Sequence, residues 1–346
     1  MGLSIGIVGL PNVGKSTLFN ALTKKGVPAE NYPFCTIDPS VGVVAVPDER
    51  LWKLANFSAT QKAIPAAVEF VDIAGLVEGA SKGEGLGNQF LSHIREVDAI
   101  LHMVRMFPIV GGGGDIAHVY GTVDPIRDIT VINLELILAD FETVTKRKSN
   151  IQKDVKRGDK TALIEDEILQ KIHDALEAGR LAKTVLLDEK EKSIIRQLGL
   201  LTMKPMLFSL NKRAGTTTII ETDIEIFNEL VTMINDMGSQ YVVVDAKIED
   251  ELKDFEGEER DMFRKELGAQ TEDDGINTLI AEAYVLLGLE TYFTTGEKET
   301  RAWTIQRGST APVAASAIHT DFGKKFIKAE VIYWSDLLDA GSLSEA

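Results

Sequence analysis

The chain has 346 residues, more than the roughly 150 of a typical domain, so two or three domains are expected. Hydrophobic residues make up 44% and charged residues 26%, which excludes general disorder. The net charge of -16 argues against generic coating of DNA or other nucleic acid. A single cysteine, Cys35, excludes an internal disulfide framework, and no apolar run is long enough to span a membrane. We therefore expect a cytoplasmic protein without membrane contact.

The chain opens with an apolar run, a glycine-containing loop and a helical pattern. Residues 3–10 predict a buried strand, and Leu18, Phe19 and Leu22 follow at helical spacing. Residues 9–16, G-L-P-N-V-G-K-S, fit the phosphate-binding pattern G-x-x-x-x-G-K-[ST]. Because a strand precedes this motif and a helix follows it, the motif predicts a nucleotide site.

Each residue type in this loop has a chemical task. Gly9 and Gly14 let successive backbone N–H groups point at the phosphates. Lys15 places a cation against the outer phosphates, and Ser16 offers a hydroxyl to Mg²⁺. The nucleotide-binding residues expected here are Asn12, Val13, Gly14, Lys15, Ser16 and Thr17.

Two further elements follow in the order of GTPase-like switch proteins. Asp72 ends a second predicted strand, residues 67–73, where it would hold Mg²⁺ through water, and the Gly75 N–H would sense the terminal phosphate. Thr36, in the preceding loop, would give the metal a second hydroxyl. The predicted metal ligands are therefore Ser16, Thr36 and Asp72. Leu76 stands where Ras-type enzymes place a glutamine that orients water, so another residue must act or hydrolysis must be slow.

Three later apolar runs predict further strands of the same sheet. They cover residues 99–104, 205–210 and 241–244, and helical segments separate them. Strands that alternate with helices favour a parallel sheet with right-handed crossovers. The segment from about 130 to 200 interrupts this order, because apolar residues recur three or four apart around a polar turn near 157–159. Two antiparallel helices projecting from the sheet domain are expected there.

In the last part of the chain the residue pattern changes from helical to strand-like. Strand-like runs at 292–294, 301–305 and 326–332 are separated by Gly, Pro and Ser residues. From about residue 277 onward, the sequence therefore predicts a small β-rich domain.

The loop expected to hold the base departs from the guanine-specific pattern. A guanine site uses N-K-x-D, whose aspartate binds two base N–H donors, but residues 211–214 read N-K-R-A. Ala214 cannot hold the guanine edge, so the choice between ATP and GTP stays open. Residues 245–247, D-A-K, follow a predicted strand and occupy the place of the last base-contacting loop. The predicted base contacts are Asn211, Lys212 and Ala246.

The charge is distributed unevenly along the chain. Residues 221–275 carry 18 acidic and 5 basic residues and are expected to form exposed acidic helix faces. Residues 145–160 carry seven basic residues against two acidic ones. A solvated helix end is the commoner meaning of so short a basic run, and an RNA-facing patch is the alternative.

Together these motifs resemble the YchF-type (Obg-like) P-loop ATPases of the Obg-related translation-factor group. The stretches that carry the resemblance are 9–23, 31–37, 69–77, 80–91, 132–136, 301–305 and 319–322. The resemblance implies an α/β fold with a G-domain-like P-loop NTPase sheet, an inserted helical coiled-coil arm and a TGS-like α+β domain. The corresponding boundaries are 1–135 with 201–276, 136–200 and 277–346. The family chain continues with more strands, so an incomplete last domain and poor anchoring of residues 330–346 are expected.

The resemblance also implies a function. It implies Mg²⁺-dependent, slow hydrolysis of ATP in preference to GTP, and binding to the ribosome or its large subunit by a monomer. His118 corresponds to a histidine proposed to act in catalysis, beside Lys15 and Gly75. Asn12 matches an asparagine that binds K⁺ in some relatives, so K⁺ dependence is a further expectation. Two features depart from the family, since Ala214 stands at an acidic position and residues 107–114 form a longer stretch before His118.

Three classes of function remain open at this point. A nucleotide switch acting on the ribosome is the leading interpretation. A translation-associated scaffold with incidental hydrolysis and a GTP-using relative are alternatives. A stand-alone metabolic NTPase or kinase would need an acceptor-substrate site, for which the sequence shows no constellation of residues.

Overall fold

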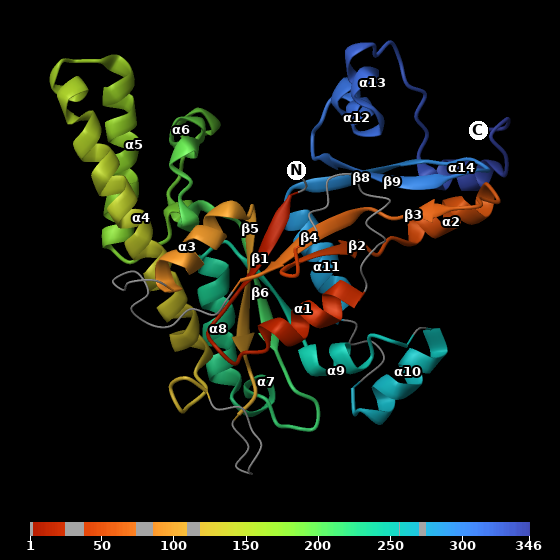
Figure 1. Cartoon of the computed structure of the whole chain (residues 1–346), viewed down its shortest axis with the longest axis horizontal. Helices are drawn as coiled ribbons and strands as arrows, with labels where there is room; N and C mark the ends of the chain where they lie inside the picture. The colour runs from red at the N-terminus through yellow and green to blue at the C-terminus, as the bar shows by residue number, and fades with distance from the viewer. Residues whose placement is uncertain (1–2, 25–37, 74–85, 109–117, 256, 270–274) are drawn as a thin grey trace. The chain divides into compact units, whose positions relative to one another are not determined.

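The computed structural model describes residues 3–24, 38–73, 86–108, 118–255, 257–269 and 275–346 (Figure 1). The chain divides into two compact units. The first unit comprises Met1–Leu3, Leu22–Glu69 and Ile276–Ala346, and the second comprises Ser4–Ala21 and Phe70–Gly275. The division into three domains that the sequence suggests stays a prediction.

A six-stranded sheet has the strand order β2-β4-β1-β5-β6-β7. Its strands are β1 (Ser4–Val8), β2 (Val41–Ala45), β4 (Ala67–Asp72), β5 (Ala99–Arg105), β6 (Met206–Asn211) and β7 (Gln240–Val244). The pairs β1–β5, β5–β6 and β6–β7 are parallel. All five strands predicted for this sheet are confirmed within one or two residues at their ends, whereas β2 was not predicted.

The central strands β5 and β6 are buried along their whole length. Strands covered on both faces are expected to be continuous apolar runs, as these two largely are. His102 of β5 is one of several buried polar residues in these strands; it is 2% exposed, and its ring stacks on Phe208 with centroids 5.1 Å apart. Burial lowers the pKa of His102 to about 3, so it packs as a neutral aromatic ring.

The helices of the second unit include the pair that projects from the sheet. The unit's helices are α1 (Lys15–Lys24), α3 (Leu86–Glu96), α4 (Pro125–Lys156), α5 (Lys160–Glu177), α6 (Glu189–Ile195), α7 (Ile219–Thr222), α8 (Ile224–Asp236), α9 (Ala246–Glu251) and α10 (Gly257–Glu266). Helices α4 and α5 lie side by side (Figure 1) and are joined by a turn at 157–159, as predicted. Gly158 takes the positive φ of +79° that the turn requires.

Charged side chains stabilise the α4–α5 hairpin and connect its base to the turn before β6. Arg147 on α4 donates two hydrogen bonds to Glu165 on α5, at 2.6 and 2.9 Å. At the base, the Asp140 carboxylate is 1% exposed and accepts hydrogen bonds from Leu201 N at 2.9 Å and from Thr202 N at 2.7 Å. This buried carboxylate ties α4 to the turn that leads into β6.

The first unit is built around a second, three-stranded sheet of order β3-β9-β8. Besides β2, its elements are α2 (Glu49–Phe57), β3 (Ala63–Ile64), α11 (Gly275–Leu286, from Ile276), β8 (Leu289–Thr294), β9 (Thr300–Gln306), α12 (Ala311–Ile318), α13 (Thr320–Lys324) and α14 (Trp334–Ala340). The Thr60 hydroxyl lies 2.6 Å from the Thr300 hydroxyl and donates to the Gly296 carbonyl. Residues near 60 therefore pack with residues near 300, and the strands predicted at 292–294 and 301–305 are confirmed.

Of two expectations for the end of the chain, one is wrong and the other holds only in part. Residues 326–332 were predicted as a strand but are irregular, with Ile327 92% and Val331 89% exposed. An apolar run becomes a strand only when another strand pairs with it, and among the described residues none does. Poor anchoring was expected for 330–346, and Val331, Tyr333 and Leu343 are indeed exposed, but residues 334–340 form α14, whose Leu337 is buried. No helix among the described residues is long and apolar enough to cross a membrane.

Candidate functional site

The loop between β1 and α1 is shaped by close backbone approaches. A Cβ atom on Gly9 would lie 2.6 Å from the Met103 carbonyl oxygen, so only glycine fits there. Gly14 has a φ of +104°, and Asn12 has a φ of +66°, which is uncommon for a residue with a side chain. Such a curled backbone is the conformation by which successive N–H groups of a phosphate-binding loop form an anion-binding concavity.

Lys15 begins α1 and folds back over the loop. Its ammonium donates hydrogen bonds to the carbonyl oxygens of Gly9 at 3.1 Å and Leu10 at 2.9 Å. The residue is 8% exposed, and burial lowers the pKa of Lys15 to about 8, while the charge of Asp72 opposes the shift. The side chain is therefore a largely desolvated cation at neutral pH, and a phosphate group would relieve that desolvation.

Ser16 and Asp72 bring two oxygen donors together. The Ser16 hydroxyl donates to the Asp72 carboxylate at 3.1 Å, which joins the first turn of α1 to the end of β4. Hydroxyl and carboxylate oxygens are the ligands that Mg²⁺ prefers, so this donor set fits the ion. The other predicted residues of this group, Thr36 and Gly75, lie outside the described residues, as do Leu76 and Cys35.

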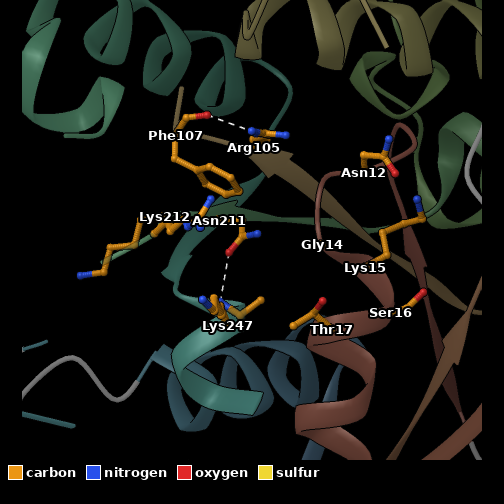
Figure 2. A pocket seen from close by; sticks show the side chains of 12 residues that line it. Asn12, Gly14, Lys15, Ser16, Thr17, Arg105, Phe107, Asn211, Lys212 and Lys247 are labelled. Atoms are coloured by element: carbon orange, nitrogen blue, oxygen red, sulfur yellow. Dashed lines mark hydrogen bonds between the residues drawn. The ribbon is translucent and has the colours of Figure 1, made fainter. Parts of the chain in front are cut away.

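Asn211, at the end of β6, joins the two ends of the pocket. Its amide nitrogen donates to the Val13 carbonyl at 2.8 Å, and its oxygen accepts the Ala246 N–H at 3.1 Å (Figure 2). The side chain is 4% exposed. Since a buried amide with both ends paired is fixed in place, Asn211 sets the position of the phosphate loop relative to the loop after β7.

Asp245 organises the loops beside Asn211. One carboxylate oxygen accepts the Ala214 N–H at 2.6 Å, and the other accepts the N–H groups of Lys247 and Ile248, both at 3.1 Å. The carboxylate thus caps α9 and also holds the loop in which Ala214 stands. Ala214 itself offers only its backbone there.

An aromatic ring flanked by guanidinium groups closes one side of the pocket. The Arg105 guanidinium lies 4.3 Å from the centre of the Phe107 ring and donates to the Phe107 carbonyl at 3.2 Å. The Arg213 guanidinium lies 5.9 Å from the same ring. We did not predict Arg105 or Phe107 as site residues. Their position at the carboxyl end of a parallel strand was the available signal, because ligands bind at that edge.

These residues line one cavity of about 410 Å³, the size of an ordinary small-molecule site. The cavity is lined by Asn12, Gly14, Lys15, Ser16, Thr17, Arg105, Phe107, Asn211, Lys212, Arg213, Ala246 and Lys247. Eight of them are residues expected from the motifs, drawn from the phosphate loop and the first turn of α1, from the end of β6 with Lys212 after it, and from the start of α9. Figure 2 shows most of them around the cavity. Val13 is not among the lining residues, but its carbonyl accepts the bond from Asn211.

His118 lies outside the residues that line this cavity. It is 3% exposed, its Nε2 lies 2.8 Å from the Asp128 carboxylate, and its Nδ1 accepts the Tyr120 N–H at 3.3 Å. The proton is therefore on Nε2, which donates to Asp128. Asp128 is itself buried in the first turn of α4, and that burial raises its pKa. In this conformation both ring nitrogens of His118 are engaged.

The strand–loop–helix, the buried lysine and the paired serine and aspartate define a P-loop nucleotide-binding protein with a GTPase-like sheet. A family model described as a 50S ribosome-binding GTPase matches residues 4–133. A second model, YchF-GTPase_C, described as a protein of unknown function (DUF933), matches residues 289–346.

Individual relatives agree with these matches over nearly the whole chain. The ribosome-binding ATPase YchF of Bacillus subtilis is 51% identical, covering 100% of this chain and 93% of the relative. The Haemophilus influenzae protein of the same name is 48% identical, covering 98% and 90%. The solved Schizosaccharomyces pombe YchF GTPase has a TM-score of 0.85 at 38% identity, covering 99% of this chain and 91% of that one. The chain belongs to the YchF family, as the motif resemblance predicted.

Proposed function

We propose that this chain is a ribosome-binding nucleoside triphosphatase that hydrolyses ATP in the cavity around Lys15. The observation that carries the proposal is the desolvated Lys15 ammonium, held by the Gly9 and Leu10 carbonyls beside the Ser16–Asp72 pair. Relatives that match almost the full chain are named ribosome-binding ATPases, which supports both the reaction and the partner.

Separate residues of the site bind the phosphates, hold the metal ion and sense the terminal phosphate. The phosphate-loop N–H groups and Lys15 bind the outer phosphates, and Ser16 and Asp72, with Thr36, hold Mg²⁺. When bound, Mg²⁺ neutralises phosphate charge and fixes the phosphate orientation. The Gly75 N–H senses the terminal phosphate, so ATP orders the loops around Thr36 and Gly75 and hydrolysis releases them.

The remaining parts of the proposal concern the base, the catalytic group and a second cation. Asn211, Lys212 and Ala246 contact the base, with ATP preferred to GTP. His118 assists hydrolysis, for which its ring has to leave Asp128 and turn toward the cavity. K⁺ binding beside Asn12 is a further element, supported by the uncommon backbone conformation of that asparagine.

The α4–α5 hairpin supplies the surface proposed to meet ribosomal RNA. Basic side chains are exposed near its tip: Lys146, Lys153, Lys156, Arg157 and Lys160. Lysine and arginine groups that neutralise phosphates release counterions, so binding through this tip weakens as salt rises.

Sedimentation with ribosomes tests the proposed partner. The chain should co-sediment with ribosomes, or with isolated large subunits, to an extent that changes between ATP and no nucleotide. Absence from the ribosome pellet in both states would refute the proposal. Equal binding in both states would favour a scaffold whose hydrolysis is incidental.

A GTP-using enzyme is the second candidate for the reaction. The matching family model and the S. pombe structure are both described as GTPases, which favours this candidate. Side-by-side turnover measurements with ATP and GTP at equal concentrations distinguish the two.

A further inference from the structure

We propose that Asp245 is the residue that sets the choice of adenine over guanine, by committing backbone N–H groups at the base end of the cavity. The inference rests on the proposed function, because it requires that the cavity bind a purine nucleotide. Asp245 does not line the cavity, so it acts through the loops that do. It is therefore a positioning residue for specificity.

Three backbone donors of lining residues at the base end are already committed to hydrogen bonds within the protein. Lys212 N donates to the Val244 carbonyl at 2.8 Å. Ala246 N donates to the Asn211 side-chain oxygen at 3.1 Å, and Lys247 N donates to Asp245 at 3.1 Å. A ligand that needs a backbone N–H here has to break one of these bonds first.

A single buried carboxylate maintains much of this arrangement. Asp245 is 7% exposed, and it binds N–H groups on both sides of the base end, from Ala214 and from the start of α9. The Ala214 bond, at 2.6 Å, holds the loop after β6 against the loop after β7. At Ala214, where a guanine-specific loop carries a base-binding carboxylate, this chain therefore offers only a backbone N–H, and that N–H is bonded to Asp245.

The two purines place opposite demands on such a site. Guanine presents an acceptor, O6, where adenine presents the N6 amino donor, and both present the N7 acceptor. With these backbone donors committed, O6 can replace its water hydrogen bonds only with those of flexible lysine and arginine side chains, which have to be ordered to make them. The adenine amino group needs an acceptor instead, and backbone carbonyls have a second lone pair to offer. The lysine and arginine side chains that line the cavity can donate to N7 of either purine and also to O6 of guanine, so the discrimination inferred here is the part that depends on backbone donors.

Asp245→Asn tests the inference. The amide oxygen can still cap α9, while the amide nitrogen faces the Ala214 N–H. The bond between positions 245 and 214 is therefore lost, and the Ala214 N–H becomes an available donor. Isothermal titration calorimetry with ADP and with GDP measures both affinities. We expect the ratio of GDP affinity to ADP affinity to rise roughly fivefold, the effect of about one hydrogen bond.

Two further variants separate selectivity from damage to the fold. Asp245→Ser keeps a good helix cap but cannot reach Ala214, and should shift the same ratio in the same direction if the asparagine variant fails to fold. Asp223→Asn is the matched control, because Asp223 caps α8 through Ile226 N at 3.1 Å and does not line the cavity. It should leave the ratio at the wild-type value.

The outcomes distinguish this inference from the proposed function. If the wild-type chain binds neither nucleotide, the proposed function fails and the inference falls with it. If the wild type binds nucleotide without favouring ADP, or if the Asp245 variants weaken ADP and GDP equally, the inference alone is overturned. A merely structural role for Asp245 predicts that last result.

Discussion

The phosphate end and the base end of the cavity are built in different ways. At the phosphate end, one contiguous stretch, residues 9–17, supplies nearly every group, and close backbone approaches fix its shape. At the base end, β5, β6 and the loop before α9 meet, and the side chains of Asn211 and Asp245 hold them together. The shape of the phosphate end is thus fixed mainly by backbone conformation and close packing, and that of the base end by a few replaceable hydrogen bonds.

This difference predicts different kinds of mutational effect. Every nucleoside triphosphate carries the same phosphates, so damage at the phosphate end should weaken all nucleotides alike. Damage at the base end should change which nucleotide is preferred. Changes to Lys15, His118 and Asn211, and a change of pH, test that separation.

Lys15→Ala should have the largest effect on binding. The variant loses a desolvated cation that would make charge-assisted hydrogen bonds to phosphate, so we expect affinities for ATP and GTP to fall by roughly 100-fold each. Fluorescence titration with labelled nucleotides measures this. Lys183→Met is the control, because Lys183 is a partly buried lysine elsewhere in the same unit that donates to Ser239. A loss confined to one purine would contradict the separation of the two ends.

His118→Ala should affect turnover and spare binding. If His118 assists proton transfer or orients water, hydrolysis should slow by roughly 100-fold while ATP affinity stays within a factor of two or three. Single-turnover hydrolysis and nucleotide titration report the two quantities. Unchanged turnover together with a lower melting temperature would assign His118 to its buried bond with Asp128 instead.

Asn211→Ala should affect both ends at once, because this side chain joins them. Removing it leaves the Val13 carbonyl and the Ala246 N–H without their partner, and we expect ATP affinity to fall roughly tenfold. Asn133→Ala is a suitable control, since Asn133 is a buried asparagine on α4 that does not line this cavity. Wild-type affinity in the Asn211 variant would show that the two ends are positioned independently.

The smallest predicted effect is a pH dependence that belongs to the phosphate end alone. Lys15 has a pKa of about 8, so it is mostly protonated below pH 8 and loses its charge as the pH rises above it. Phosphate binding favours the charged form, so affinity should fall about threefold between pH 7.5 and 8.5, with proton uptake on binding.

Calorimetry in buffers of different ionisation enthalpy measures that proton uptake. Lys183 also has a pKa lowered to about 8, yet Lys183→Met should keep the wild-type pH dependence because Lys183 lies outside the cavity. Proton release on binding, or affinity that rises with pH, would show that Lys15 does not meet the phosphates.

The same contrast explains what the sequence could predict. The strand, loop and helix around Lys15 followed from one motif, because all the interactions that shape them are local. The bond between Asp245 and Ala214 joins positions 31 residues apart and leaves no pattern in the sequence. Phe107 lies two residues beyond the end of β5. Because ligands bind at the carboxyl ends of parallel strands, that position could have identified Phe107 as a site residue.

The strand assignments show a related limit. The buried central strands were predicted because continuous apolar runs identify them. Strand β2 lies at one edge of the sheet, is only half-buried and contains Gly42, so its signal was weak. Residues 326–332 have strand-like composition but no partner among the described strands, and composition alone does not supply one.

The most direct test of the account is an equilibrium titration of the chain with non-hydrolysable analogues of ATP and GTP in the presence of Mg²⁺. The account predicts saturable binding of both at one site, tighter for the ATP analogue and roughly 100-fold weaker for both in Lys15→Ala. Tighter binding of the GTP analogue, or binding of the ATP analogue that keeps its wild-type affinity without Lys15, would contradict it.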